Sequence, residues 1–384
     1  MAQPGAPRVA PLEGLRALDL TGELGWLLGK ILADLGVEVM KLDPPGGDPG
    51  RDLPPLIHGP AGSAGATWIA FNAGKRRLDL DLMSPGGRAR LLELAASADF
   101  LLESEAPGRL EELGIDWPQL SERNAGLVMT SVTPYGLDGP LAHAPASDLE
   151  LMAAGGAVWL TGDPDRPPVR VTVPQAASWA CANAAVGTLI AYHVKRLTGH
   201  GQHVDVSAQC AVLPMLVHAP NFWEMLGVNP MRAGAFLVGR NTHGAGTRNI
   251  WPCKDGYLTF AVYGGAAGRH SNRNLVGWMA EEEMAPPWLL AIDWDTYEVA
   301  AMSVAEVERM EAVIRPFFLT MTKREFLHQA DARRMLGYVV ATAEDIAADP
   351  QLEARSVWAD VDVPELGGPV RLPVNWFRLA EAGT

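Results

Sequence analysis

The chain has 384 residues, 48% of them hydrophobic and 20% charged, so it can bury a sizeable core and is too long for one ordinary domain. Its formal net charge of −14 argues against nucleic acid or an anionic membrane as a general partner, because phosphate-rich surfaces bind basic faces. The three cysteines are widely spaced and favour a reducing compartment. No apolar run reaches the roughly 18 residues of a membrane helix, and Met1–Pro11 lacks the apolar run of a signal peptide. We therefore expect a cytoplasmic α/β protein.

The first half of the chain alternates predicted strands with predicted helices. Strands at Leu15–Leu20 and Val37–Leu42 flank a helix at Leu24–Leu35, whose leucines recur on one side. A strand, a helix and a strand in so short a segment predict parallel strands with a right-handed crossover. The Pro- and Gly-rich run Pro44–Pro60 is expected to be loop. Later elements continue the alternation: strand 78–82, a helix from Ser84 to Ala96, strands 99–103 and 127–132, helix 175–193 and strand 202–207.

This alternation predicts a doubly wound sheet. No GxGxxG follows the first strand, so dinucleotide binding of that type is not supported. Near Pro220 the composition changes, and a strand at Tyr257–Val262 is followed by helices at Glu306–Phe318 and Lys323–Ala330. We predict a large domain formed by residues 1–219 with 336–384 and a smaller domain formed by residues 220–335.

Isolated reactive side chains do not define a site. His200, His203 and Asp205 are close in sequence, but a turn that leads into a strand sends alternate side chains to opposite faces, so we expect no metal there. Cys181 lies in an Ala-rich helix and is typical of a small core residue. Ser178 has no G-x-S-x-G elbow around it, which disfavours a serine hydrolase.

The densest basic run is Lys75-Arg76-Arg77. In an acidic protein it could contact a phosphate, and it could equally be a solvated turn before the next strand. The residues alone leave both interpretations open.

Several longer stretches, in order, resemble the family III CoA-transferases. They are PLEGLRALDL at the start, Ile31–Arg51, Phe71–Glu103, Leu113–Gly136, Lys195–Gln209, Pro252–Leu258 and Thr342–Trp358. Each is modest alone, and the ordered set covers nearly the whole chain. The resemblance implies a Rossmann-like doubly wound large domain, a smaller α+β domain, and a dimer of two interlocked rings.

The resemblance also implies a reaction. Family members move coenzyme A between organic acids without a metal, by way of an Asp that attacks the acyl-CoA thioester. That Asp stands ten residues before a Gly in the Ala-rich helix, after a strand like Pro167–Val171. Counting back from Gly187, 187 − 10 = 177, and Ala177 occupies the position. The racemase branch needs a His–Asp pair, and its positions hold Ser147, before Asp148, and again Ala177, so racemisation is disfavoured more strongly.

The resemblance assigns coenzyme A contacts to Lys75, Arg76, Leu80, Asp81, Pro107 and Gly108. Pro107 and Gly108 match the end of an ENF-x-PG motif whose other positions are altered. Glu105 in that motif places an anion near the expected diphosphate.

A missing Asp is typical of one subunit in the benzylsuccinate branch of the family, which pairs two homologous subunits of which one carries the Asp. Val173–Ala176 (VPQA) and Gly29–Gly36 (GKILADLG) resemble the Asp-lacking subunit. This predicts a non-catalytic subunit of a heteromer that transfers CoA from succinyl-CoA to an acid such as benzylsuccinate. Its expected partners are a homologous Asp-containing subunit, CoA esters and dicarboxylic acids.

Two alternatives remain open. The chain could form a homodimeric CoA-ester enzyme of another kind, a hydrolase, lyase or isomerase that uses Asp148 or Ser178. It could instead be a non-enzymatic CoA-ester binding protein.

Overall fold

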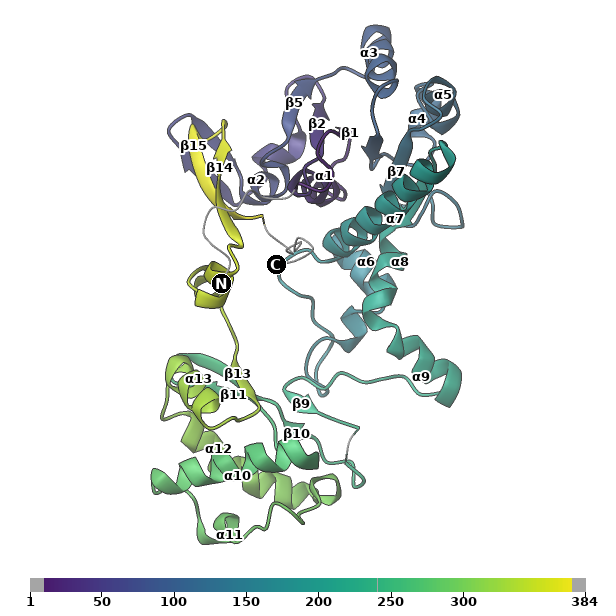
Figure 1. The fold of residues 1–384 in the computed structure, drawn as a ribbon. Coiled ribbons are helices and arrows are strands. Elements are labelled where there is room, and N and C mark those ends of the chain that lie inside the picture. The colour runs from purple at the N-terminus through teal and green to yellow at the C-terminus, as the bar shows by residue number, and fades with distance from the viewer. Residues whose placement is uncertain (1–9, 240, 375–384) are drawn as a thin grey trace. The chain divides into compact units, whose positions relative to one another are not determined.

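The computed structural model describes residues 10–239 and 241–374 (Figure 1). The chain forms two compact units, which we describe separately. Unit 1 comprises Met1–Trp159, Arg170–Pro230 and Pro350–Thr384, and unit 2 comprises Leu160–Val169 and Met231–Asp349. The domain bounds predicted from sequence, 1–219 with 336–384 against 220–335, stay a prediction. They also include residues 1–9, 240 and 375–384, which lie outside the described part.

Unit 1 is built on a six-stranded sheet in the order β5-β2-β1-β6-β7-β8, in which every neighbouring pair is parallel. Its strands are β1 (Arg16–Asp19), β2 (Glu38–Asp43), β5 (Arg76–Asp79), β6 (Phe100–Glu103), β7 (Val128–Thr133) and β8 (His203–Ser207). The predicted parallel α/β sheet is confirmed. From β1 the chain runs outward through β2 and β5, then returns to β6 on the other side of β1. The strand order therefore reverses between β1 and β6, where ligands of open α/β sheets bind.

Helices cover both faces of this sheet. The helices of unit 1 are α1 (Trp26–Asp34), α2 (Ala66–Asn72), α3 (Pro85–Ala95), α4 (Arg109–Glu112), α5 (Trp117–Arg123), α6 (Asp148–Ala154), α7 (Ala176–Thr198), α8 (Ala208–Val212) and α9 (His218–Leu226), of which α9 buries no residue. On one face, α1 and α7 pack Leu28 and Ala184 against Val128. On the other face, α3 and α5 pack Leu91 and Leu120 against the sheet. The small side chains of α7 allow this long helix to lie close to β7.

The predicted start of α3 is confirmed, because the Ser84 hydroxyl accepts a hydrogen bond from the Gly87 amide at 3.0 Å. The predicted strand at residues 78–82 is displaced. β5 begins at Arg76 and ends at Asp79, which pairs with Asp43 at the end of β2. The bounds of β5 are therefore set by its pairing with β2 and not by the alternation of apolar and polar residues. The predicted strand at Pro167–Val171 is absent, since this segment pairs with no neighbouring strand and contains two prolines.

The expected loop at Pro44–Pro60 is only partly a loop. It contains β3 (Leu56–Gly59), which forms a hairpin with β4 (Gly62–Gly65). The C-terminal part of unit 1 adds α15 (Pro350–Ala354) and a second hairpin of β14 (Trp358–Val363) and β15 (Gly368–Pro373). The two hairpins share a core with Trp26 and Trp68, so the C-terminal segment packs beside the start of the sheet.

Unit 2 combines small antiparallel sheets with helices. Its elements are β9 (Phe236–Leu237), β10 (Thr247–Arg248), β11 (Ile250–Cys253), β12 (Gly256–Phe260), α10 (Gly265–Glu281), α11 (Pro287–Leu290), α12 (Val304–Phe318), α13 (Lys323–Ala332), β13 (Gly337–Val339) and α14 (Ala343–Ala347). The predicted strand near residues 257–262 and the two predicted helices are confirmed as β12, α12 and α13. Phe318 lies at the centre of the core, with its ring next to those of Trp251, Phe260 and Phe326.

Candidate functional site

A cavity of about 590 Å³ lies at the carboxyl ends of β5, β2, β1 and β6 in unit 1. The segments that follow these strands line it, including Thr21–Glu23, Pro44–Pro45, Leu80–Met83 and Glu105. The cavity therefore includes the reversal point between β1 and β6. Leucine and proline make up nearly half of its lining residues, and such side chains suit an apolar group.

A buried ion pair lies beneath the cavity. The Lys75 ammonium contacts the Asp19 carboxylate at 2.8 Å, and both side chains are fully buried. The same ammonium donates to the Trp26 carbonyl and to Asn72 Oδ1, each at 2.8 Å. Burial alone would raise the pKa of Asp19, but Lys75 and a second lysine hold that pKa below its usual value. A Cβ on Gly29 would lie 2.2 Å from the Asp19 carboxylate, so only glycine allows α1 to pass this close.

The second lysine, Lys41, is also internally paired. Its ammonium donates to the Thr21 carbonyl at 2.7 Å and lies 3.3 Å from both Asp43 and Asp48. Asp48 in turn accepts a hydrogen bond from the Trp26 indole at 2.9 Å. These contacts hold the segments after β1 and β2 in place, and they leave the lysine charges neutralised by the protein itself.

Two arginines contact Met83 at the rim of the cavity, and their charges are less enclosed than those of the lysines. Arg88 donates to the Met83 carbonyl at 2.8 Å, and an Arg109 nitrogen lies 3.0 Å from the Met83 sulfur. Met83 lines the cavity, as does Arg109. Arg109 also pairs with Glu112 at 2.9 Å on the exposed side. The sequence analysis missed both arginines, because their approach depends on the turn between β5 and α3 rather than on any motif.

The carboxylates near β6 make the cavity partly acidic. Glu105 lines the cavity, and its backbone amide donates to Glu103 Oε2 at 2.7 Å. Burial raises the pKa of Glu103 to about 7, and a hydrogen bond from Ser131 opposes that rise. The Ser131 hydroxyl also contacts His203 Nε2 at 2.8 Å, which joins β6, β7 and β8 through polar side chains.

The structure separates the residues predicted to contact coenzyme A. Leu80 and Asp81 line the cavity. Pro107 and Gly108 lie between two lining residues, and Gly108, with φ of 85°, begins α4 in the left-handed conformation that glycine favours. Lys75 is buried beneath the cavity, as described above. Arg76, at the amino end of β5, is 71% exposed and pairs with Glu38.

Position 177 lies in the first turn of α7, and Ala177 is half-buried there. The nearby carboxylate is that of Asp148, whose Oδ1 accepts hydrogen bonds from the Gln175 and Ala176 amides, each at 2.7 Å. Asp148 thus stabilises the start of α7, where free N–H groups favour an anion. Ser147 is the N-cap of α6, with Glu150 as the reciprocal partner of its capping box.

The surroundings of the remaining candidate residues, Cys181, His200 and His203, do not indicate a catalytic or metal-binding role. Cys181 is buried, its thiol donates to the Leu24 carbonyl, and burial raises its pKa to about 12, so it is a poor nucleophile. His200 is exposed, and the ring of His203 stacks on Trp117. Within residues 10–239 and 241–374, no cluster of three or more His, Cys, Asp or Glu side chains could hold a metal. In the same part of the chain, no helix is long and apolar enough to cross a membrane.

A doubly wound parallel sheet with a cavity at its reversal point defines the general class, an open α/β fold of the kind that binds ligands at its strand ends. The sequence model of CoA-transferase family III matches residues 12–384, and the chain belongs to this family. It is 35% identical to the succinyl-CoA:(R)-benzylsuccinate CoA-transferase subunit BbsE of Thauera aromatica, over 95% of this chain and 87% of the relative.

Other relatives carry different acids in their names. The chain is 31% identical to the succinyl-CoA–D-citramalate CoA-transferase of Chloroflexus aurantiacus, over 93% of this chain and 85% of the relative. Among solved structures it resembles a CAIB/BAIF family protein from Brucella suis, with a TM-score of 0.80 and 26% identity over 97% of this chain and 93% of the other. The α/β fold predicted from the resemblance is confirmed, the interlocked dimer stays a prediction, and the relatives support a transferase that uses CoA esters.

Proposed function

We propose that this protein is the non-catalytic subunit of a hetero-oligomeric CoA-transferase that moves CoA from succinyl-CoA to an organic acid such as benzylsuccinate. The observation that carries the proposal is Ala177. A methyl group stands in the first turn of α7, at the position where the family's reaction needs a carboxylate nucleophile. The likeness to a BbsE subunit supports the choice of acid.

The groups near Ala177 do not offer an obvious replacement for the nucleophilic carboxylate. Oδ1 of Asp148 accepts two backbone hydrogen bonds, so nucleophilic attack by this carboxylate would disturb the start of α7. Ser178 has no histidine or carboxylate among its hydrogen-bond partners in the described residues. A nucleophile supplied by a second, homologous chain is therefore the simpler arrangement.

Exposed apolar side chains support an assembly. Val186 and Ile190 form a stripe along α7, and Trp223, Met225 and Leu226 are exposed on α9. Apolar groups that gather on a surface commonly mark an interface. We propose that a homologous Asp-containing chain covers them, in the interlocked arrangement that the family resemblance implies.

In this proposal the cavity of unit 1 receives the nucleotide part of coenzyme A. Leu80, Asp81 and the Pro107–Gly108 turn form or adjoin its walls. Arg88 and Arg109 at the rim supply the positive charge for phosphate. Lys75 supports the site from below rather than contacting the ligand.

Co-expression with a homologous Asp-containing chain tests the proposal. We expect a mixed oligomer that transfers CoA from succinyl-CoA to benzylsuccinate, whereas this chain alone shows no activity and no hydroxylamine-trapped acyl intermediate. Replacing the partner's Asp by Ala should abolish activity.

Ala177→Asp in this chain should change activity little. The introduced carboxylate would follow directly after Ala176, whose amide binds Asp148, and the nearby negative charge raises the pKa of a new acid. Activity of the mixed oligomer after loss of the partner's Asp, or transferase activity of this chain alone, would refute the proposal.

A further inference from the structure

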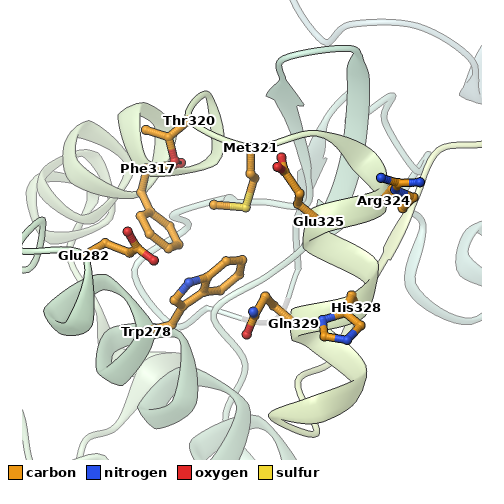
Figure 2. Close-up of a pocket in the computed structure, with 9 residues that line it drawn as sticks. All are labelled: Trp278, Glu282, Phe317, Thr320, Met321, Arg324, Glu325, His328 and Gln329. Atoms are coloured by element: carbon orange, nitrogen blue, oxygen red, sulfur yellow. The ribbon is translucent and has the colours of Figure 1, made fainter.

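Titratable side chains gather in a groove of unit 2 and in a buried row of unit 1. The groove, of about 470 Å³, lies between the end of α10 and α13, and Glu282 and Glu325 share it with Arg324 and His328 (Figure 2). All four are exposed, so solvent screens their charges, and Arg324 partly offsets the acids. The row in unit 1 is different, because its carboxyl is buried and the groups that act most on it include no cation.

The row crosses three neighbouring strands near their carboxyl ends. Glu103 of β6 pairs with Ser131 of β7, and Ser131 pairs with Asp205 of β8. Paired residues of a sheet project to the same face, and His203, two residues before Asp205, projects there too. The four side chains therefore lie side by side on the face that α3 and α5 cover.

The Ser131 hydroxyl joins the Glu103 carboxyl to the His203 ring. It forms a hydrogen bond with Glu103 and lies 2.8 Å from His203 Nε2. A hydroxyl donates one hydrogen, so Ser131 can donate to only one of these neighbours at a time. If Glu103 is protonated, the acid donates to Ser131, and Ser131 donates to His203 Nε2. If Glu103 is ionised, Ser131 donates to Glu103, and His203 presents an N–H at Nε2. Both patterns are complete, and they differ in the proton of Glu103.

The surroundings of Glu103 bring the two patterns close in free energy near neutral pH. Burial raises the pKa of Glu103 to about 7; the hydrogen bond from Ser131 opposes this rise, and the charges of Glu105 and Asp205 add to it. At the other end of the row, burial lowers the pKa of His203 and Asp205 opposes that change. The His203 ring is fixed by stacking on Trp117 of α5, with ring centroids 5.8 Å apart.

The cations of neighbouring elements are engaged elsewhere. Arg109 of α4 pairs with the exposed Glu112. The Asp19–Lys75 ion pair lies on the other face of the sheet, because Asp19 pairs with Leu102, the residue before Glu103. The row therefore has no lysine or arginine that would hold Glu103 in its ionised form.

The Glu103 end of the row reaches the wall of the cavity in unit 1. Glu103 Oε2 accepts the Glu105 amide at 2.7 Å, and the Ser104 hydroxyl accepts the Gly22 amide at 2.8 Å. Glu105 and Gly22 both line the cavity. Glu103 thus holds the turn that forms this wall, and the charge of a ligand in the cavity acts on its carboxyl across little solvent.

We propose that Glu103, Ser131 and His203 form a two-state hydrogen-bond chain, through which Glu103 takes up a proton from solvent when an anionic ligand enters the cavity of unit 1. Glu103 is a positioning residue and does not touch the ligand. A negative ligand disfavours the ionised pattern, so affinity falls as the pH rises through the range in which Glu103 loses its proton. Coenzyme A as the ligand rests on the proposed function, whereas the two-state chain does not.

Calorimetric titration of the assembled protein with coenzyme A at about pH 6 and about pH 8 tests the ligand linkage. Glu103→Gln is the reference, because its amide can donate to Ser131 and accept from Glu105 as the protonated acid does. Relative to this variant, wild type should lose roughly fivefold in affinity between the two pH values. It should also take up protons on binding, measured in buffers of different ionisation enthalpy. Glu111→Gln, which removes an exposed carboxylate of α4 outside the cavity lining, should behave as wild type.

Ser131→Ala tests the chain without a ligand. Loss of the hydroxyl that stabilises the ionised form should raise the pH at which Glu103 titrates. The infrared carbonyl band of a protonated carboxylic acid, absent in Glu103→Gln, should therefore persist to higher pH in Ser131→Ala than in wild type.

The outcomes separate this inference from the proposed function. Coenzyme A binding with the same pH dependence in wild type and Glu103→Gln would overturn the linkage alone. A carboxylic acid band that Ser131→Ala leaves unchanged would overturn the two-state chain. Absence of coenzyme A binding at both pH values would overturn the linkage together with the proposed role of the cavity.

Discussion

Two sets of charged side chains close to the cavity of unit 1 differ in what they contact. Lys75 lies beneath the cavity and Lys41 lines it, and both ammonium groups are enclosed by Asp19, Asp43 and backbone carbonyls. At the rim, the arginines contact Met83 and remain close to solvent. The lysines have all their hydrogen-bond acceptors within the protein, whereas the arginines can exchange their contacts for contacts with a ligand.

The difference shows that closeness to a ligand cavity does not make a cation a ligand contact. A buried lysine with three acceptors would have to break those bonds to reach a phosphate, and it would leave a buried carboxylate unpaired. The arginines have contacts at or near the surface: Arg109 pairs with the exposed Glu112, and Arg88 donates to the Leu82 and Met83 carbonyls, of which only the first bond is partly buried. Losing such contacts costs little stability. We therefore expect the buried set to affect folding and the rim set to affect binding.

The largest expected effect is on stability. Lys75→Met should lower the free energy of unfolding by about 3–5 kcal/mol, because it leaves the Asp19 carboxylate buried without its ion-pair partner. Arg76→Gln, which removes the neighbouring exposed cation, should lower it by less than about 1 kcal/mol. Urea unfolding of both variants measures the difference, and similar midpoints would contradict the assignment of Lys75 to the folded core.

Glu103 is a buried charged group whose effect on stability can be measured as a function of pH. Its folded-state pKa of about 7 lies above the ordinary value of 4.5, so the protonated acid is the form favoured by folding. Its contribution to stability is complete below pH 4.5 and is lost as the pH rises through about 7, a total of about 3 kcal/mol. Ser131 donates to Glu103, while Glu105 and Asp205 add negative charge nearby.

Urea unfolding of wild type and Glu103→Gln at about pH 5 and about pH 8 measures this contribution. Wild type should lose stability between the two values relative to the variant. Glu93→Gln, which removes an exposed carboxylate on α3, should retain the wild-type pH dependence. A parallel pH response of wild type and Glu103→Gln would contradict the prediction.

The smallest expected effect concerns binding at the rim. Arg88→Gln and Arg109→Gln should each weaken coenzyme A binding to the assembled protein roughly tenfold, with little change in stability, because each removes one charge-assisted contact to phosphate. Arg76→Gln is the control, since this exposed arginine lies at the opposite, amino end of β5. Calorimetric titration with coenzyme A measures all three. An equal loss in the Arg76 variant would place the phosphates elsewhere.

Local patterns predicted the sheet well where strand and helix signals were long. The leucine periodicity of α1 and the Ser84 N-cap of α3 both appear as expected. Position 177 was located by counting along the chain, and the structure places it in the first turn of α7. Short signals failed. β3, which pairs with β4, lies in the Pro- and Gly-rich run, and Pro167–Val171 forms no strand.

The candidate site was predicted less completely than the fold. Leu80 and Asp81 line the cavity, but Lys75 and Arg76, adjacent in sequence, end in opposite environments. In a strand, successive side chains point to opposite faces, and Lys75 comes one residue before β5 begins. Which cation is buried depends on Asp19, 56 residues away, and no local pattern contains that pairing.

The sequence by itself determined the alternation of strands and helices and the family, and it predicts by counting along the chain that Ala177 stands where the family reaction needs a carboxylate. These features are local or follow the order of the chain. Only the tertiary structure decided which charges are enclosed and which are available, because that depends on side chains brought together by the parallel pairing of distant strands. It also decided that Asp148 holds the start of α7 and that the end of α10 faces α13 across a groove that contains Trp278 and Phe317.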